Sequence, residues 1–321
     1  MDVLNRPPFA LGTFYEDGEP FAGLVVDAHV LDLGGPLGAG VTTFGLLQSW
    51  DENLERLHAL AIEGDTGSLE LSELRPRVPV TPRQVLCAGA NYHRHVSQMA
   101  FDFLRRDGDE RPDEELREAA RQIAAGLADN DPFLFAGLPS ALSGAEDDIV
   151  LWGPGEQHDW ELELAVVIGR GGRNIPIESA MEHIAGYTIS NDISTRDLLA
   201  RPNFPMSDLV MTKNRPTFFP TGPYIVPRSA VPDPQQLRVT LRLNGEVMQD
   251  ESVDDLIHGI DRLVAYASTA AELYPGDLLL TGSPAGNAAH HNHRWLRPGD
   301  LIEGEITGLG RQRNRCVAPS A

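Results

Sequence analysis

Apolar and polar positions alternate at the start of residues 159–170, DWELELAVVIGR. In an extended strand successive side chains point to opposite faces, so one face of this stretch would carry Leu162, Leu164, Val166 and Ile168. Glu161 and Glu163 would share the other face, with Ala165 and Val167 beyond them. We therefore predict a buried strand that carries two neighbouring carboxylates. Burying them without a cation is unfavourable, because each loses hydration and the two repel each other.

Short strand patterns dominate the chain from residue 150 onward. They are ELELAVVIG, AGYTISND, GPYIVP, LRVTLRLNGEVMQ, DLLLTGS and DLIEGEITGLG. Asn244 and Gly245 form an Asn-Gly pair that is typical of a tight β-hairpin turn. Many strands, few helices and two Pro-Gly-Asp turns, at 275–277 and 298–300, favour an α+β, β-rich fold with a rolled or barrel-like sheet over a doubly wound parallel sheet.

Apolar positions three or four residues apart predict helices at three places. The first ends at Gly64, the second lies in a charged, Ala-rich pattern at residues 107–131, and the third covers residues 253–273, where Ser252 is a good N-cap. The apolar faces of these helices are expected to carry, in order, Leu54, Leu57 and Ala61; Leu116, Ile123 and Leu127; and Leu256, Ile257, Ile260, Leu263, Val264 and Ala267.

The chain divides near residue 80. Residues 1–80 are predicted to form a small β-rich N-terminal domain and residues 81–321 a larger domain, with the proline-rich segment LRPRVPVTPRQ, which cannot be helical, as the connector. Residues 107–131 are interpreted as a helical insertion between two regions rich in polar residues. A plain surface helix is the preferred interpretation, and a lid over a site or a contact with a partner is the alternative.

The amino-acid composition limits the kinds of partner that the protein is expected to bind. Lys and Arg total 26 against 47 Asp and Glu, so the net charge of −21 repels nucleic acid but attracts a divalent cation. The start of the chain lacks the pattern of a secretory signal, and no stretch approaches the roughly 18 apolar residues of a membrane span. The two cysteines, Cys87 and Cys316, cannot form a disulfide framework. We expect a cytoplasmic protein that binds neither nucleic acid nor membranes.

A third carboxylate gives the two glutamates a role. Asp192 ends the next predicted strand, in YTISNDISTRD, so three carboxylates would meet at neighbouring strand ends. Such oxygen ligands suit Mg²⁺ or Mn²⁺, although each acidic residue alone is more often solvated or paired. The histidines of AAHHNHRW, at 290, 291 and 293, lack the further ligand of a tetrahedral zinc site, so this segment is interpreted as a mobile loop beside the site.

From about residue 86 onward the chain resembles the fumarylacetoacetate hydrolase family. The matching segments occur in the family's order: GANYHRH, DWELELAVVIGR, GYTISNDISTRD, TKNRPTFFPTGPYIV, LRLNGEVMQD, PGDLLLTGSPAG and LRPGDLIEGEITGLG. No segment is decisive alone, but the ordered set is specific. The resemblance implies a mixed β-roll catalytic domain in a homodimer, which acts with Mg²⁺ or Mn²⁺ on small 2-oxo acids or 1,3-dicarbonyl compounds, as in aromatic catabolism.

The resemblance also implies residue roles. The metal ligands would be Glu161, Glu163 and Asp192, the catalytic residues His95, which activates water, and Lys213. Residues expected to bind substrate are Tyr92, Arg196, Thr281 and Ser283, the last standing where the family usually has threonine.

Two positions depart from the family pattern. Gln98 stands where hydrolases of the family commonly pair the histidine with glutamate, and Leu199 replaces a common glutamine. Glu114 or Glu118 of the insertion is a candidate replacement for the missing acid.

These departures leave three classes of function open. The preferred one is metal-dependent hydrolysis of a C–C bond in an acylpyruvate-like or other 1,3-dicarbonyl substrate. The alternative is decarboxylation or keto–enol isomerisation of a 2-oxo diacid, which needs no activated water. A binding protein without catalytic activity is the least favoured class, because the three repelling carboxylates are retained.

Overall fold

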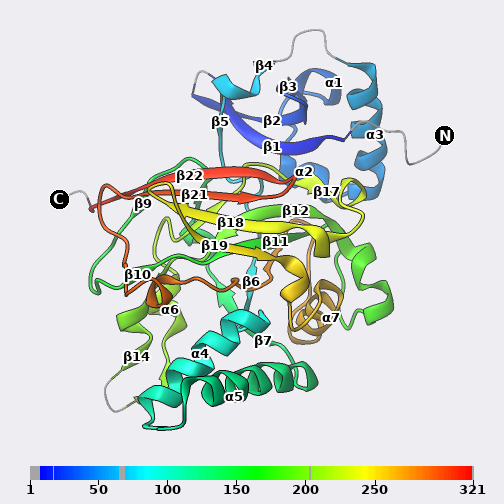
Figure 1. The fold of residues 1–321 in the computed structure, drawn as a ribbon. Helices are drawn as coiled ribbons and strands as arrows, with labels where there is room; N and C mark the ends of the chain where they lie inside the picture. Colours follow the sequence, from blue (N-terminus) through cyan, green and yellow to red (C-terminus); the bar gives the residue numbers. More distant parts are fainter. Residues whose placement is uncertain (1–7, 17, 65–68, 202–203, 320–321) are drawn as a thin grey trace.

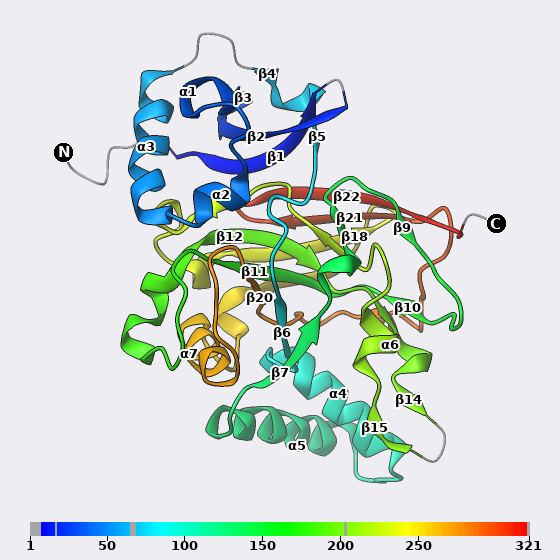
Figure 2. The ribbon, with the colours of Figure 1, turned by 180° about the vertical axis from the view of Figure 1, so that it is seen from behind.

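The computed structural model describes residues 8–16, 18–64, 69–201 and 204–319. Two larger β-sheets form the middle of the molecule, with the N-terminal residues on one side and a pair of helices, α4 and α5, on the opposite side (Figures 1 and 2). The protein is a β-rich α+β structure with curled sheets, as the strand pattern predicted.

The N-terminal residues form a five-stranded sheet in the order β4-β3-β2-β1-β5, with three helices beside it. The predicted helix is α3, and Gly64 at its end has a φ of 67°, a conformation that favours glycine. The bounds of these elements are β1 Ala10–Glu16, β2 Glu19–Val26, β3 His29–Asp32, β4 Leu69–Glu70, β5 Arg75–Pro76, α1 Gly34–Leu37, α2 Thr43–Leu47 and α3 Trp50–Glu63.

The largest sheet positions the site. Its order is β7-β6-β20-β11-β12-β16-β8, and β17 also pairs with β12. Pairs β6–β20 and β8–β16 are parallel, and the others are antiparallel. The strands are β6 Val85–Gly89, β7 Phe133–Gly137, β8 Leu142–Gly144, β11 Leu162–Ile168, β12 Ile184–Asn191, β16 Phe219–Thr221, β17 Val226–Pro227 and β20 Leu278–Leu280.

A second large sheet has the order β19-β18-β21-β22-β9. Asn244, with a φ of 52°, and Gly245 make the tight turn between β18 and β19, which confirms the predicted hairpin. The strands are β9 Ile149–Val150, β18 Arg238–Leu243, β19 Glu246–Ser252, β21 Leu301–Ile306 and β22 Gly310–Val317. Two small ribbons pair β10 His158–Asp159 with β13 Ser194–Thr195, and β14 Ala200–Arg201 with β15 Phe204–Ser207.

Strand β11 is buried on both faces, as the alternation predicted. Leu162, Leu164, Val166 and Ile168 join the larger hydrophobic cluster, which includes residues of the second large sheet. Ala165 and Val167 join a different cluster together with N-terminal residues such as Leu24 and Leu57. The backbones of Leu11 and Ile225 also bond to each other across this junction. The N-terminal sheet therefore packs directly against the larger part of the chain, and the domain boundary near residue 80 stays a prediction.

The helix predicted at 253–273 is shorter. Helix α7 spans Ile260–Ala270 with Gly259 as N-cap, and Ser252 instead ends β19 and donates its hydroxyl to Gln235. The prediction failed because Asn91 bonds the preceding segment: its backbone oxygen accepts from Ile257 N, and its side chain accepts from His258 N. A short 3₁₀ turn, Val253–Asp255, follows Ser252, and these tertiary bonds separate it from α7, although the apolar spacing is that of one helix.

The 107–131 insertion is the second helix of a hairpin. Helix α4 (His93–Arg106), which the apolar spacing did not predict, is followed by α5 (Asp113–Gly126). On α5, Leu116 is buried as predicted, but Ala120 and Ala124 accompany it, and Ile123 is 46% exposed. The predicted apolar face was thus partly wrong, because small alanines allow α5 to lie close to α4. Helix α6 (Leu209–Lys213) completes the set of helices within the described residues.

Burial on both faces makes β11 sensitive to truncation. We expect Leu164→Ala to lower the free energy of unfolding by about 2–5 kcal/mol, because the fully buried leucine leaves a cavity. Leu138→Ala is the matched control, since Leu138 is 42% exposed and should change stability by less than about 1 kcal/mol. Urea denaturation of both variants measures the difference, and equal losses would contradict the packing described for β11.

Candidate functional site

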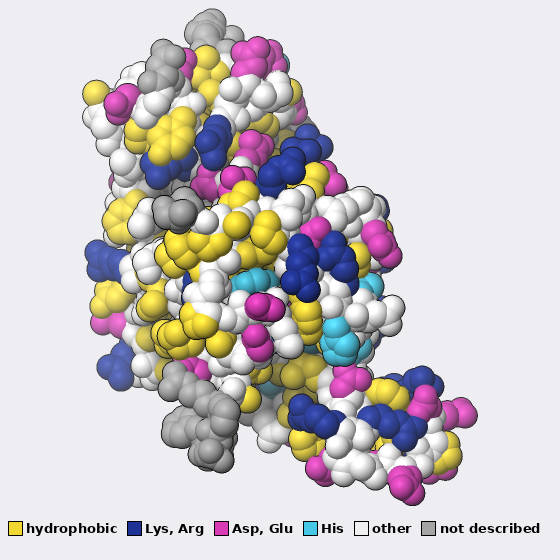
Figure 3. All heavy atoms as spheres, turned by 90° about the vertical axis from the view of Figure 1, so that its left-hand side faces the viewer, with side chains coloured by type: hydrophobic (Ala, Val, Ile, Leu, Met, Phe, Trp, Pro, Cys, Tyr) yellow, Lys and Arg dark blue, Asp and Glu magenta, His cyan; other side chains and the backbone are white. Residues whose placement is uncertain are grey.

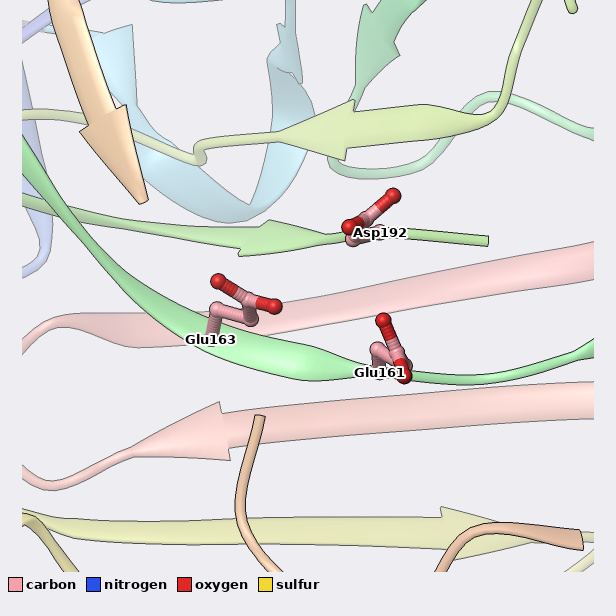
Figure 4. Close-up of side chains that lie close together, drawn as sticks. All are labelled: Glu161, Glu163 and Asp192. Atoms are coloured by element: carbon pink, nitrogen blue, oxygen red, sulfur yellow. The ribbon is translucent and has the colours of Figure 1, made fainter. Parts of the chain in front are cut away.

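Three carboxylates lie close together at the start of β11. Glu161 precedes β11 and Glu163 lies within it, and their side chains point to the same side, toward Asp192 at the end of β12 (Figure 4). Antiparallel pairing produces this arrangement: Leu162 pairs with Asn191, and Asp192 N donates to Glu161 O at 2.8 Å. One oxygen from each carboxylate lies within 4.8 Å of the other two, and all three residues are buried. The structure therefore brings together the predicted metal ligands.

Two cations lie against this cluster, the buried Lys213 and the partly buried Arg196, whose side chain is 24% exposed. Lys213, at the end of α6, places Nζ 2.5 Å from Glu161 Oε2, 2.5 Å from Asp192 Oδ2 and 2.9 Å from Ser194 Oγ. Arg196 donates from Nη2 to Glu161 Oε1 at 2.5 Å and from Nε to Asp159 Oδ2 at 2.8 Å. Lys213 thus contacts two of the proposed metal ligands. The guanidinium of Arg196 donates its hydrogen bonds to two carboxylates of the protein itself.

Asp159 is a fourth buried carboxylate that sequence reasoning missed. Its Oδ1 accepts from Trp160 N at 2.9 Å and from Ala288 N at 2.8 Å, and its Oδ2 accepts from Arg196. Hydrogen bonds satisfy both oxygens, so Asp159 holds Arg196 and the 288 backbone in place. The signal was present in the sequence, because Asp159 lies two residues before Glu161 and therefore on the same face of an extended chain.

The remaining charge of this cluster fits a divalent cation. Four buried carboxylates, Asp159, Glu161, Glu163 and Asp192, are paired with two cations, Arg196 and Lys213, so two negative charges are unbalanced when all four are ionised. Asp192 Oδ1 is buried without a hydrogen-bond partner. The donor set, three carboxylates with an unpartnered oxygen, suits Mg²⁺ or Mn²⁺.

The pKa values reflect this imbalance. Burial opposes ionisation of Glu161, but Arg196 and Lys213 outweigh it and hold the pKa of Glu161 below its usual range. Burial together with the charges of Asp192 and Glu161 raises the pKa of Glu163 well above its usual value. Burial also raises the pKa of Asp192 to about 6, although Lys213 acts against it. A bound cation would reverse these upward shifts by favouring the ionised forms.

The loop after β20 contacts Glu163 through a backbone hydrogen bond. Gly282 N donates to Glu163 Oε2 at 2.8 Å, and Gly282 has a φ of 100°. A Cβ at this position would lie 2.9 Å from Asn91 Cβ, so the close approach requires glycine. Thr281 is fully buried and donates its hydroxyl to Leu164 O at 3.0 Å, and the hydroxyl of Ser283 accepts from Gln249 at 2.9 Å. Both proposed substrate-binding hydroxyls are therefore engaged with the protein.

Helix α4 brings His95 to the cluster. His95 is buried, and its Nδ1 has no hydrogen-bond partner. Burial lowers the pKa of His95 to about 4, although the nearby Glu161 acts against this shift. Tyr92, the residue before α4, is fully buried, and burial and the charge of Glu163 hold the pKa of its hydroxyl above the usual range. Because its pKa is lowered to about 4, the imidazole of His95 is neutral at physiological pH.

Neither candidate carboxylate of the insertion is bonded to His95. Glu118 is exposed and accepts from Arg121 and Gln122, and Glu114 is exposed on the same helix. Gln98, three residues after His95, accepts from Gly286 N at 3.3 Å. Leu199 is half-buried in the turn that precedes β14. The hypothesis that the insertion replaces the missing glutamate is thus unsupported by the contacts of these residues.

A cavity of about 710 Å³ lies between the helix pair α4–α5 and the loop that follows β20. Basic and acidic side chains lie together on the lower part of the molecule in Figure 3, where α4 and α5 lie in Figure 1. The cavity is lined by His93, Arg94, Ser97, Gln98, Phe101, Asp102, Arg117, Arg121, Ala124 and His290. It is large enough for a small organic acid, and Gln98 links its wall to the helix turn that carries His95.

Comparison with known proteins identifies the class. Residues 84–317 match the family model described as fumarylacetoacetate (FAA) hydrolase, C-terminal. The chain is 33% identical over 251 residues to the human protein named oxaloacetate tautomerase FAHD2B, mitochondrial, a match that covers 78% of this chain and 71% of that protein. The chain belongs to the fumarylacetoacetate hydrolase family, which confirms the resemblance found in the sequence.

Solved structures of the family share the fold over nearly the whole chain. Fumarylacetoacetate hydrolase from psychrophilic Exiguobacterium antarcticum is 26% identical, with a TM-score of 0.76 over 97% of this chain and 100% of that one. Maleylpyruvate hydrolase from Sphingobium sp. SYK-6, in complex with manganese(II) and pyruvate, is 25% identical, with a TM-score of 0.74 over the same shares. The family thus includes enzymes named as tautomerases and as hydrolases, so membership alone does not select the reaction.

Within the described residues, no helix is both long enough and apolar enough to cross a membrane. The predicted cytoplasmic location and the predicted homodimer stay predictions.

Replacing Glu163 tests the cation site. We expect Glu163→Gln to abolish the rise in melting temperature that Mn²⁺ produces, since a neutral amide lowers the charge of the site by one. At 100 times the Kd, one bound ion stabilises the native state by about 2.7 kcal/mol. Without metal the variant should be at least as stable as the wild type, because a repelling buried carboxylate is gone. Exposed Glu156→Gln is the control, and an unchanged Mn²⁺ response of Glu163→Gln would exclude Glu163 as a ligand.

Proposed function

We propose that the protein is a metal-dependent tautomerase, which moves a proton between the carbon beside the keto group and the keto oxygen of a 2-oxo diacid such as oxaloacetate. The observation that carries this proposal is the environment of His95. It is buried and neutral, position 98 carries an amide instead of a carboxylate, and neither Glu114 nor Glu118 is bonded to it. Water activation by histidine normally relies on a carboxylate that stabilises the imidazolium. Tautomerisation requires no activated water.

A cation held by Glu161, Glu163 and Asp192 would supply Lewis acidity at the substrate's oxygen atoms. Lys213 and Arg196 fix the geometry of these carboxylates, since each donates to Glu161 while it also bonds a second acid. Neutral His95 can donate an N–H hydrogen bond to the oxygen on which negative charge develops. The buried surroundings strengthen that bond because water is excluded. The similarity to a curated oxaloacetate tautomerase supports the same reaction type.

A second candidate function is hydrolysis of a C–C bond in an acylpyruvate-like substrate. The observation that favours it is the likeness to maleylpyruvate hydrolase over 97% of this chain. His95 stands at the family position of the water-activating histidine. The unpaired environment of His95 ranks this function below tautomerisation.

The first test compares two substrates. With saturating Mn²⁺, we expect the wild type to accelerate ketonisation of enol-oxaloacetate and to cleave acetylpyruvate slowly or not at all. His95→Gln should lower the tautomerisation rate by about 10²-fold, because the neutral N–H donor to the oxygen is displaced. His29→Gln, on the exposed part of β3, is the control. Rapid release of acetate with no effect on oxaloacetate would reject the tautomerase in favour of the hydrolase.

The second test restores the carboxylate at position 98. Gln98→Glu keeps an acceptor for Gly286 N and places a negative charge one helical turn from His95. We expect any hydrolysis of acetylpyruvate to rise about tenfold for each 1.4 kcal/mol of imidazolium stabilisation, with tautomerisation nearly unchanged. Gln98→Met is the control: it also removes the amide but adds no charge, so a difference between the two variants reports the effect of the charge. If Gln98→Glu left hydrolysis unchanged while both variants stayed folded, His95 would not be limited by a missing carboxylate.

A further inference from the structure

His290 lies in a loop that hydrogen bonds tie to the strand of the carboxylates. Asn287 Nδ2 donates to Trp160 O at 2.9 Å, and Trp160 Nε1 donates to Gly286 O at 3.0 Å. Ala288 N bonds Asp159, and His291 Nε2 lies 2.9 Å from Met248 O. The loop predicted to be mobile is therefore fixed on both sides of His290, within the 3₁₀ turn Ala288–His290.

Helix α4 presents a carboxylate to this histidine. His95, Gln98 and Asp102 are three and four residues apart, so they share one face of α4, which is directed to the loop. Gln98 bonds Gly286 of the loop, and Asp102 Oδ2 lies 3.2 Å from His290 Nε2. The carboxylate that the family pattern places beside His95 is thus present one turn further along α4, where it serves a different histidine.

The contact with Asp102 favours one tautomer of His290. Both ring nitrogens of His290 are buried and make no hydrogen bond, and Asp102 Oδ2 is the acceptor that lies near Nε2, at 3.2 Å. A carboxylate beside Nε2 favours the tautomer with the proton on Nε2, which leaves a lone pair on Nδ1. His290 lines the same cavity as Gln98 and Asp102, and its side chain keeps 20% of its surface exposed. Burial lowers the pKa of His290, while the charges of Asp102 and Asp159 act against that effect.

We propose that His290, held by Asp102, is the base that removes the proton from the carbon beside the keto group. This inference rests on the proposed tautomerase function and assigns it a residue outside the family motif positions. The C–H bond breaks, its proton passes to Nδ1 of His290, and its electron pair becomes the C=C bond of the enol. The carbonyl π pair moves to the oxygen, where His95 donates a hydrogen bond. Water supplies the enol proton, and the hydroxide that remains takes the proton from Nδ1 of His290, which restores the neutral imidazole.

The two histidines then have opposite roles for a physical reason. A paired carboxylate stabilises the imidazolium that forms when a histidine takes a proton, and only His290 has such a partner. His95 lacks one and stays neutral, so it is suited to donate a hydrogen bond. Lys213 is excluded as the base, because both Glu161 and Asp192 hold its ammonium form.

The activity test measures exchange of the C3 protons of a 2-oxo acid, 2-oxobutyrate, in deuterium oxide with Mn²⁺ bound. We expect His290→Gln to lower the exchange rate by about 10²-fold or more, as for loss of a general base. Mn²⁺ affinity by calorimetry should be unchanged. His293→Gln, an exposed position in the same loop, is the matched control and should keep wild-type exchange. Undiminished exchange in His290→Gln would overturn the inference and leave the proposed function intact, whereas absence of exchange and of ketonisation in the wild type would remove the proposed function itself.

A second measurement tests the role of Asp102 without relying on turnover. Long-range ¹H–¹⁵N spectra should show His290 protonated on Nε2 in the wild type, a mixture of tautomers in Asp102→Asn, and recovery in Asp102→Glu. Exchange rates should follow the same order, with the largest loss in Asp102→Asn. A His290 that carries its proton on Nδ1 in the wild type would contradict the assignment of Nδ1 as the base, whatever the activity.

Discussion

The excess of buried negative charge beside β11 is the constraint on which the rest of the site depends. Four carboxylates without compensation would be driven to bind protons or to unfold the strand. Arg196 and Lys213 come from separate segments and are fixed by ion pairs to these acids. The backbone N–H groups of Gly282 and Ala288 are fixed by hydrogen bonds to two of these acids, Glu163 and Asp159 respectively. A divalent cation would complete the balance, so one charge requirement positions Arg196, Lys213 and the two backbone segments around the carboxylates.

The position of β11 between two hydrophobic clusters makes this requirement strict. Leu164 and its neighbours face one cluster, and Ala165 and Val167 face the other, so bulk water has little access to the carboxylates. Electrostatic interactions are stronger in such surroundings than at a surface. The exclusion of water would therefore strengthen both the attraction of the carboxylates to a cation and the proposed hydrogen bond from His95 to the substrate. The N-terminal sheet contributes here although it supplies no site residue, because it covers one face of β11.

The sequence was sufficient for features that depend on local spacing. The shared face of Glu161 and Glu163, the Asn244–Gly245 hairpin and the end of α3 at Gly64 follow from backbone geometry alone. Features that depend on distant partners were missed or misplaced. The start of α7 moved because Asn91 bonds the preceding segment. Arg196, whose role in substrate binding stays a prediction, also pairs with Asp159 and Glu161, and the sequence did not indicate these ion pairs. Pairing between Asp102 and His290 joins residues 188 positions apart, counted from their numbers, and no local pattern could indicate it.

The placement of one carboxylate along α4 explains how a common cation site can serve different reactions. A carboxylate at position 98 would lie one turn from His95 and favour its protonated form, which water activation needs. At position 102 the carboxylate instead reaches His290 on the facing loop. The histidine that gains the partner becomes the better base, and the one that loses it becomes a neutral donor. Neither change touches Glu161, Glu163 or Asp192, so the cation site can be retained while the proton-transfer groups exchange roles. On the proposed assignment, the distribution of acids around the two histidines, rather than the metal ligands, selects between hydrolysis and tautomerisation.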